Sequence, residues 1–167
     1  MNNCTIQNNA DGGIGGSTPD DTTTKITNNT IDDNAAHGIK INFGSGASFT
    51  IDGNTVSNSS NNVGGGDGIL FYSQGGPTTG TISNNTVSGN ARVGIRILAK
   101  SVGSITATSS NNSILNNGSY GLVLADEGGS SALASSYNAS NNTITGNGGG
   151  IAAGAKSFRS TLVTTAI

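Results

Sequence analysis

The amino-acid sequence predicts an all-β solenoid, in which short strands of successive coils stack into parallel sheets. Three observations lead to this prediction. An apolar anchor residue, two asparagines and a glycine recur at fixed offsets along the chain. The residues after each glycine alternate between apolar and polar, the period expected of a strand with one buried face. No segment shows the period of a helix, and one copy is too small to bury its own apolar face, so the copies must share one core.

The composition agrees with a repeat fold and argues against several classes of partner. Of the 167 residues, 32% are hydrophobic and 10% are charged, which is poor for a globular core, but apolar residues at fixed spacing can stack into a continuous column. A formal net charge of −2 with seven Lys and Arg gives no basic surface for nucleic acid, and no apolar run is long enough to span a membrane. We therefore expect no nucleic-acid partner and no membrane insertion. Cys4 is the single cysteine, which excludes an internal disulfide.

Each copy centres on an apolar anchor in a turn segment that is rich in asparagine. The anchors are Ile6, Ile31, Val56, Val87, Ile114 and Ile144, at steps of 25, 25, 31, 27 and 30 residues. Two positions before the anchor stand Asn29, Asn54, Asn85, Asn112 and Asn142, with Cys4 in the first copy. Three positions after it stand Asn9, Asn34, Asn90, Asn117 and Asn147, with Ser59 in the third copy. Stacked coils would align these amides in two hydrogen-bonded ladders.

A glycine introduces the strand that follows each turn. The glycines are Gly13, Gly38, Gly68, Gly94, Gly121 and Gly150, of which Gly68 is delayed by an insertion and Gly150 comes one residue early. Glycine and asparagine are residue types that tolerate φ > 0 and close tight turns. The inward pairs of the strand are expected to be Ile39 and Ile41, Ile69 and Phe71, Ile95 and Ile97, Leu122 and Leu124, and Ile151 and Ala153. The residues between them, Lys40, Leu70, Arg96, Val123 and Ala152, should face solvent.

A further β-branched and aromatic segment precedes each asparagine turn and predicts another short strand. Its apolar residues are Ile26, Phe49, Ile51, Ile82, Ile105, Ala107, Tyr137 and Ala139. The turn units Ile-Thr-Asn-Asn-Thr-Ile (26–31) and Ile-Ser-Asn-Asn-Thr-Val (82–87), each followed by Asn, Gly and an Ile-x-Ile strand, resemble the repeat of pectate-lyase-like right-handed parallel β-helix proteins.

The resemblance covers about residues 2–154 and implies a single-stranded β-solenoid of about five to six coils of 25 to 31 residues. We assign the repeats to residues 1–154 and residues 155–167 to an incomplete coil, a cap or a non-native tail. The family implies an extracellular or cell-surface location. The first residues lack the basic and apolar regions of a signal peptide, which favours a chain that begins within a longer precursor.

The candidate functional residues lie on the outward strand positions. His37 and Asp67 each precede the glycine of their coil and should be neighbours at about one strand spacing, while Lys40 and Arg96 should share one outward row at about 10 Å. A histidine oriented by a carboxylate can act as a general base, and Lys or Arg can neutralise a uronate carboxylate. In this hypothesis His37, Lys40, Asp67 and Arg96 form the catalytic set, while Tyr72 and Arg96 bind substrate.

We favour a simpler interpretation, a solvated sheet face with a few solubilising charges. The chain would then be a non-catalytic module of a surface protein, a rigid rod or a carbohydrate-facing platform, or a segment of a larger β-helix that associates end to end through open strand edges. The alternative is an acidic-polysaccharide lyase. A glycoside hydrolase is disfavoured because the acidic pairs Asp20–Asp21, Asp32–Asp33 and Asp126–Glu127 are sequence neighbours rather than facing carboxyls.

Two further assignments are weighed and set aside. Asn28, Asn84, Asn111 and Asn141 fit the Asn-x-Ser/Thr glycosylation pattern, but the repeat itself generates this pattern. Gly65-Gly66-Asp67-Gly68 is similar to a calcium-binding repeat, but it occurs once. Cys4 and His37 share no ligand spacing with other Cys or His residues. The sequence therefore predicts no metal and no cofactor.

Overall fold

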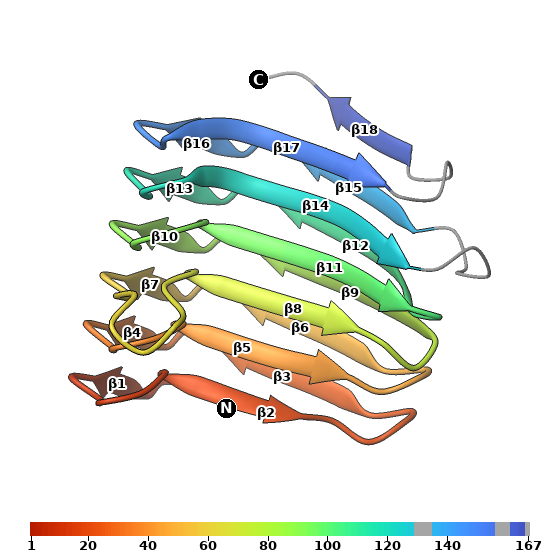
Figure 1. Ribbon diagram of the computed structural model, residues 1–167, viewed down its shortest axis with the longest axis horizontal. Helices are drawn as coiled ribbons and strands as arrows, with labels where there is room; N and C mark the ends of the chain where they lie inside the picture. The colour runs from red at the N-terminus through yellow and green to blue at the C-terminus, as the bar shows by residue number, and fades with distance from the viewer. Residues whose placement is uncertain (129–134, 156–160, 166–167) are drawn as a thin grey trace.

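The chain is a right-handed parallel β-solenoid with three faces, each formed by a six-stranded parallel sheet. The computed structural model describes residues 1–128, 135–155 and 161–165, and Figure 1 shows the coils stacked along the axis of the solenoid. The described residues form no helix that could span a membrane. The predicted all-β repeat fold is confirmed.

The three sheets take one strand each from every coil, so that sheet neighbours are three strands apart in the chain. Sheet 1 contains β1 (Thr5–Gln7), β4 (Thr30–Asp32), β7 (Thr55–Ser57), β10 (Thr86–Ser88), β13 (Ser113–Leu115) and β16 (Thr143–Thr145). Sheet 2 contains β2 (Ile14–Ser17), β5 (Ile39–Phe43), β8 (Ile69–Ser73), β11 (Ile95–Ser101), β14 (Tyr120–Gly128) and β17 (Gly149–Ala155). Sheet 3 contains β3 (Thr23–Thr27), β6 (Ser48–Asp52), β9 (Pro77–Ser83), β12 (Ser104–Ser110), β15 (Ser136–Ser140) and β18 (Thr161–Thr165).

The register of sheet 1 matches the predicted anchors residue by residue. Ile6 pairs with Ile31, and the column continues through Val56, Val87, Ile114 and Ile144. Unequal coil lengths therefore do not shift the register, because the insertions fall in the turns between sheets.

Both predicted asparagine ladders are present. In the first ladder the backbone N–H and Nδ2 of Asn29 donate to Oδ1 of Asn54 at 3.0 and 2.9 Å. The same pattern continues along Asn85, Asn112 and Asn142. Asn29, Asn54, Asn85 and Asn112 are buried. Each amide thus satisfies the backbone of the preceding coil inside the solenoid, where an unpaired group would be costly.

The turns on either side of sheet 1 require left-handed backbone. Asn28 and Asn84 have φ of 55°, and the equivalent Gly53 has φ of 65°. Residues two positions after the anchor repeat this conformation, for example Gly89 with φ of 65°. Asparagine and glycine are the residues that reach this region at low cost, which explains why the first Asn of each Asn-Asn pair recurs.

The glycines at the start of β2, β5, β8, β11 and β14 meet a different requirement from the turn glycines. Gly94 is absent from the left-handed region, but a Cβ built on it would lie 2.6 Å from Cγ2 of Ile114 and 2.7 Å from the carbonyl oxygen of Gly121. The anchor of the next coil therefore packs directly over the glycine. This close approach, rather than φ, excludes a side chain.

The core consists of the inward columns of the three sheets. Ile95 and Ile97 are both fully buried. Phe43, Phe49 and Phe71 pack together, with ring centroids 5.0 to 5.3 Å apart.

Two predictions about strand exposure need correction. Leu70 was predicted to face solvent, but only 1% of it is exposed. It lies in register between Lys40 and Arg96, whose long aliphatic stems flank it on the outer face. Ile151 and Ala153 keep their predicted register with Leu122 and Leu124, yet both are exposed, Ile151 by 40%, because β17 is at the edge of sheet 2.

Candidate functional site

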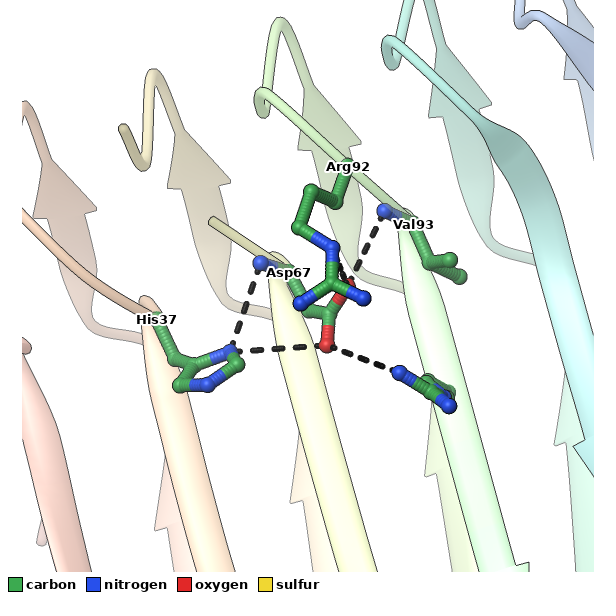
Figure 2. Close-up of polar contacts among 5 residues, drawn as sticks. His37, Asp67, Arg92 and Val93 are labelled. Atoms are coloured by element: carbon green, nitrogen blue, oxygen red, sulfur yellow. Dashed lines mark hydrogen bonds and ion pairs between the residues drawn. The ribbon is translucent and has the colours of Figure 1, made fainter. Parts of the chain in front are cut away.

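The candidate site lies on the outer face of sheet 2, around the start of β5, β8 and β11. His37, Asp67 and Val93 occupy equivalent positions before the glycine of successive coils, as Figure 2 shows. The parallel register brings these three residues side by side. The repeat alone therefore assembles residues that are about thirty positions apart in the sequence.

Asp67 is the centre of the polar cluster and has no solvent exposure. Its Oδ1 accepts a hydrogen bond from the backbone N–H of Val93 at 3.1 Å and lies 4.0 Å from Nε of Arg92. Its Oδ2 lies 3.5 Å from Nδ1 of His37, as Figure 2 shows. The same oxygen lies 3.8 Å from Nη1 of Arg96. Oδ2 accepts no hydrogen bond from the described residues, so the nearby cations compensate the buried charge mainly through space.

His37 is buried against the same carboxylate. The backbone N–H of Asp67 donates to Nδ1 of His37 at 3.3 Å, which places the proton of the neutral imidazole on Nε2. Burial lowers the pKa of His37 most strongly, the charge of Asp67 raises it, and Lys40, Arg92 and Arg96 lower it further. The imidazole is therefore neutral at neutral pH.

Two depressions adjoin this cluster on the outer face. The first, of about 370 Å³, is lined by His37 and Lys40 together with Asp11, Gly12, Ile14, Gly15, Ala36, Val63 and Gly64. The second, of about 430 Å³, is lined by Lys40, Asn42, Tyr72 and Gln74 together with Gly16 and Ser17. Lys40 lines both depressions, so they lie next to each other across the coils of β2, β5 and β8, and together they are called the groove below.

Tyr72 lines the groove, but its ring already has a neighbour. Nζ of Lys100 lies 4.5 Å from the centroid of the Tyr72 ring. A cation over an aromatic face is attracted to the ring. Stacking of a sugar on Tyr72 would therefore use the other face of the ring or displace Lys100.

Of the predicted site residues, His37 and Arg96 each come within 4 Å of the Asp67 carboxylate. Lys40 is two register positions from Arg96 in the same outward row, with Leu70 between them. Tyr72 lies with Lys40 at the second depression. The predicted neighbourhood of His37 and Asp67 is thus observed, despite the insertion in the third coil.

Sequence reasoning missed two cations of this face, Arg92 and Lys100. Arg92 precedes the position equivalent to His37 and Asp67, and Lys100 lies four residues after Arg96 on the same side of β11. Arg92 lies in the turn before the glycine, and Lys100 lies beyond the Ile-x-Ile segment that recurs in the repeat, so the repeat pattern marks neither position.

Other chemistries find little support in the described residues. They contain no group of three or more His, Cys, Asp or Glu side chains that could hold a metal ion. Asp20 and Asp32 hold turns and strands of the next coil, since Asp20 Oδ1 accepts from the Ser45 N–H at 2.7 Å and Asp32 Oδ1 accepts from Ser57 Oγ at 2.6 Å. The side chains of Asp126 and Glu127 lie outside the described part of the structure.

The comparisons with known proteins identify the fold family. The family described as "Right handed beta helix region" matches residues 1–79 and 76–167. No curated protein and no solved structure matches the chain. Because the matched residues extend over the whole sequence, this chain belongs to the right-handed β-helix family.

Proposed function

We propose that this chain is a non-catalytic β-solenoid module of an extracellular or cell-surface protein, which presents the outer face of sheet 2 to an acidic polysaccharide. The observation that carries the proposal is the shallow groove centred on Lys40, with volumes of about 370 and 430 Å³ on its two sides. A shallow polar groove with an adjacent aromatic ring suits an extended sugar chain better than a compact ligand.

The charge distribution supports an anionic ligand. Lys40, Arg92, Arg96 and Lys100 are four of the seven Lys and Arg residues of a chain with a net charge of −2. All four lie on or beside the outer face of sheet 2, where Arg92 and Arg96 flank the buried Asp67 and Asp11 is the one carboxylate that lines the two depressions. A locally positive surface on a weakly acidic protein attracts anionic chains and repels cationic ones.

The same geometry argues against catalysis. Arg96 is directed at Asp67 rather than at the groove, with its Nη1 3.8 Å from the carboxylate, and it therefore contributes less to a substrate carboxylate. Nδ1 of His37 accepts from the backbone of Asp67, so the proton on Nε2 leaves this tautomer without a basic nitrogen toward the groove. The proposed role is binding by a rigid rod, whose ladders fix the spacing of the coils.

Binding assays test the proposal. The chain should be retarded in affinity electrophoresis by polygalacturonate, alginate or a glycosaminoglycan and not by neutral dextran. Lys40→Ala and Tyr72→Ala should each weaken retardation several-fold, whereas Lys25→Ala, an exposed lysine of β3 on another sheet, should have no effect. Equal weakening by Lys25→Ala would show that binding depends on net charge and not on the groove. No retardation by any of these polysaccharides would refute the proposal.

A second part of the proposal concerns assembly. Strands at the edges of the stack carry unpaired backbone groups, which favour pairing with another solenoid end to end. Light scattering coupled to size-exclusion chromatography should then show a mass that rises with protein concentration. A single monomeric mass at all concentrations excludes this assembly and leaves the binding role untouched.

One observation favours an acidic-polysaccharide lyase as a second candidate: His37 and Lys40 line the same depression, and the imidazole is neutral. In such a reaction a base removes the proton beside the uronate carboxylate, the C4–O bond breaks, and the leaving oxygen takes up a proton. In this candidate the base is His37 or Lys40; because Nδ1 of His37 already accepts the Asp67 N–H, the step falls to Lys40 only if the lysine gives up its proton on binding the substrate. Ultraviolet absorbance of unsaturated ends should then rise with wild type and not with Lys40→Ala; no rise on any uronate polymer rejects the lyase.

A further inference from the structure

The second asparagine ladder is interrupted at one step, between Asn34 and Ser59. At its three other Asn-to-Asn steps, from Asn9 to Asn34, from Asn90 to Asn117 and from Asn117 to Asn147, Nδ2 donates to the next Oδ1 at 2.8 Å. The backbone N–H of the same residues donates to that Oδ1 at 2.9 to 3.2 Å. Ser59 offers no amide to Asn34.

The interruption leaves four polar groups with incomplete hydrogen bonding. Asn34 is 1% exposed, and in the described structure its backbone N–H has no acceptor while its Nδ2 donates only to the Ile6 carbonyl at 3.2 Å. Ser59 is also 1% exposed, and its Oγ has no partner among the described residues. The carbonyl of Ile31 lacks the amide donor that the carbonyls of Ile6, Val56, Val87 and Ile114 receive from the ladder.

The coils do not close up to remove the space of the missing amide. Across the interruption the N–H of Ser60 donates to the Asn34 carbonyl at 2.9 Å. The equivalent bonds on either side, from Ala35 to Asn9 and from Ala91 to Ser59, are 3.0 and 2.8 Å. A serine side chain therefore stands in a gap sized for an asparagine side chain, which has two more heavy atoms.

We propose that a single buried water molecule completes the ladder at this step. It accepts from the backbone N–H and Nδ2 of Asn34, and it donates to the Ile31 carbonyl and to Ser59 Oγ. These two donors and two acceptors match the tetrahedral capacity of water, and buried waters in proteins typically make about three such bonds. An ion fits less well, because an anion would face the Ile31 carbonyl and a cation would face two N–H groups.

Water–amide cross-relaxation on the ¹⁵N-labelled chain tests the site. We expect a cross-peak from long-lived water at the Asn34 amide and none at the Asn90 amide, which donates to Asn117 Oδ1 at 3.1 Å. Ser59→Asn should abolish the Asn34 cross-peak and raise the thermal midpoint by about 2 to 4 °C. Ser88→Asn, on an outward position of β10, should change neither.

A second variant separates bound water from exchange of the serine hydroxyl proton. Ser59→Ala keeps the space and removes the hydroxyl, so the cross-peak at Asn34 should persist if water occupies the site. A cross-peak that disappears in Ser59→Ala would assign the signal to the hydroxyl and overturn the proposal. Absence of any cross-peak at Asn34 in the wild-type protein would overturn it as well.

Discussion

The inner columns of the solenoid and the outward row of sheet 2 are built from the same coils, but they obey different rules. The anchor column contains only Ile and Val through six strands. The outward row of sheet 2 reads Gly15, Lys40, Leu70, Arg96, Val123 and Ala152. Inside the stack each side chain contacts its copies above and below, so any change is felt by three coils. On the outer face, residues of adjacent coils differ in size and charge, so a single residue can change the surface without changing the core.

The largest expected contrast compares neighbours on one strand. Ile95→Ala removes a fully buried side chain between two stacked coils and should cost about 2 to 5 kcal/mol of unfolding free energy. Chemical denaturation followed by circular dichroism measures this loss. A loss below that of the adjacent Arg96→Ala would mean that the assigned inward and outward phases are reversed.

The ladder should be the next most sensitive element. Asn85→Ala removes the acceptor of both the N–H and Nδ2 of Asn54, and leaving buried donors unpaired costs about 1 to 3 kcal/mol each. Asn84→Gly is the matched control, because the exposed Asn84 has φ of 55°, which glycine adopts without strain, and it loses only an exposed hydrogen bond from Nδ2 to Asp52. Equal denaturation midpoints for the two variants would show that the ladder hydrogen bonds contribute no more to stability than an exposed turn residue does.

The polar cluster links the outward face to pH. The folded-state pKa of His37 is lowered, chiefly by burial, so the unfolded state binds the proton more readily. Stability should therefore be fully present above the unfolded value of about 6.5 and decline as pH falls from there toward the lowered pKa. His37 is the only histidine in the chain, so His37→Gln should flatten this part of a plot of unfolding free energy against pH. An unchanged slope in His37→Gln would mean that other titratable groups cause the pH dependence of stability.

The smallest effect is expected for Arg96→Ala. The guanidinium is partly exposed, and Asp67 keeps the Val93 N–H and the Arg92 side chain as partners. The Arg96–Asp67 contact is long, at 3.8 Å, and is one of several around this carboxylate, so its loss should cost less than the loss of the only partner of a buried charge. A melting experiment should show a shift much smaller than that of Asn85→Ala. A large shift would make the cluster a structural element rather than a surface feature.

Much of the fold was predictable because stacking translates one-dimensional spacing directly into three dimensions. The anchors, both ladders and the proximity of His37 and Asp67 followed from counting residues. Arg92 and Lys100 did not follow from the repeat, since Arg92 precedes the glycine and Lys100 lies beyond the recurring Ile-x-Ile segment of the strand. The burial of Leu70 was missed because alternation assigns a face of the sheet, and it says nothing of what the side chains of adjacent coils cover.

The sequence by itself determined the coil, its register and its inward columns, because each is a local pattern repeated at fixed intervals. Only the tertiary structure decided which outward side chains meet around Asp67. It likewise decided which tautomer of His37 the backbone N–H of Asp67 selects. It also decided that Gly94 is needed for the approach of Ile114 and that Ser59 leaves a gap opposite Asn34. These outcomes depend on how long each side chain is and where it points between coils about 4.8 Å apart. The spacing of residues along the chain gives the position of a side chain and not its direction.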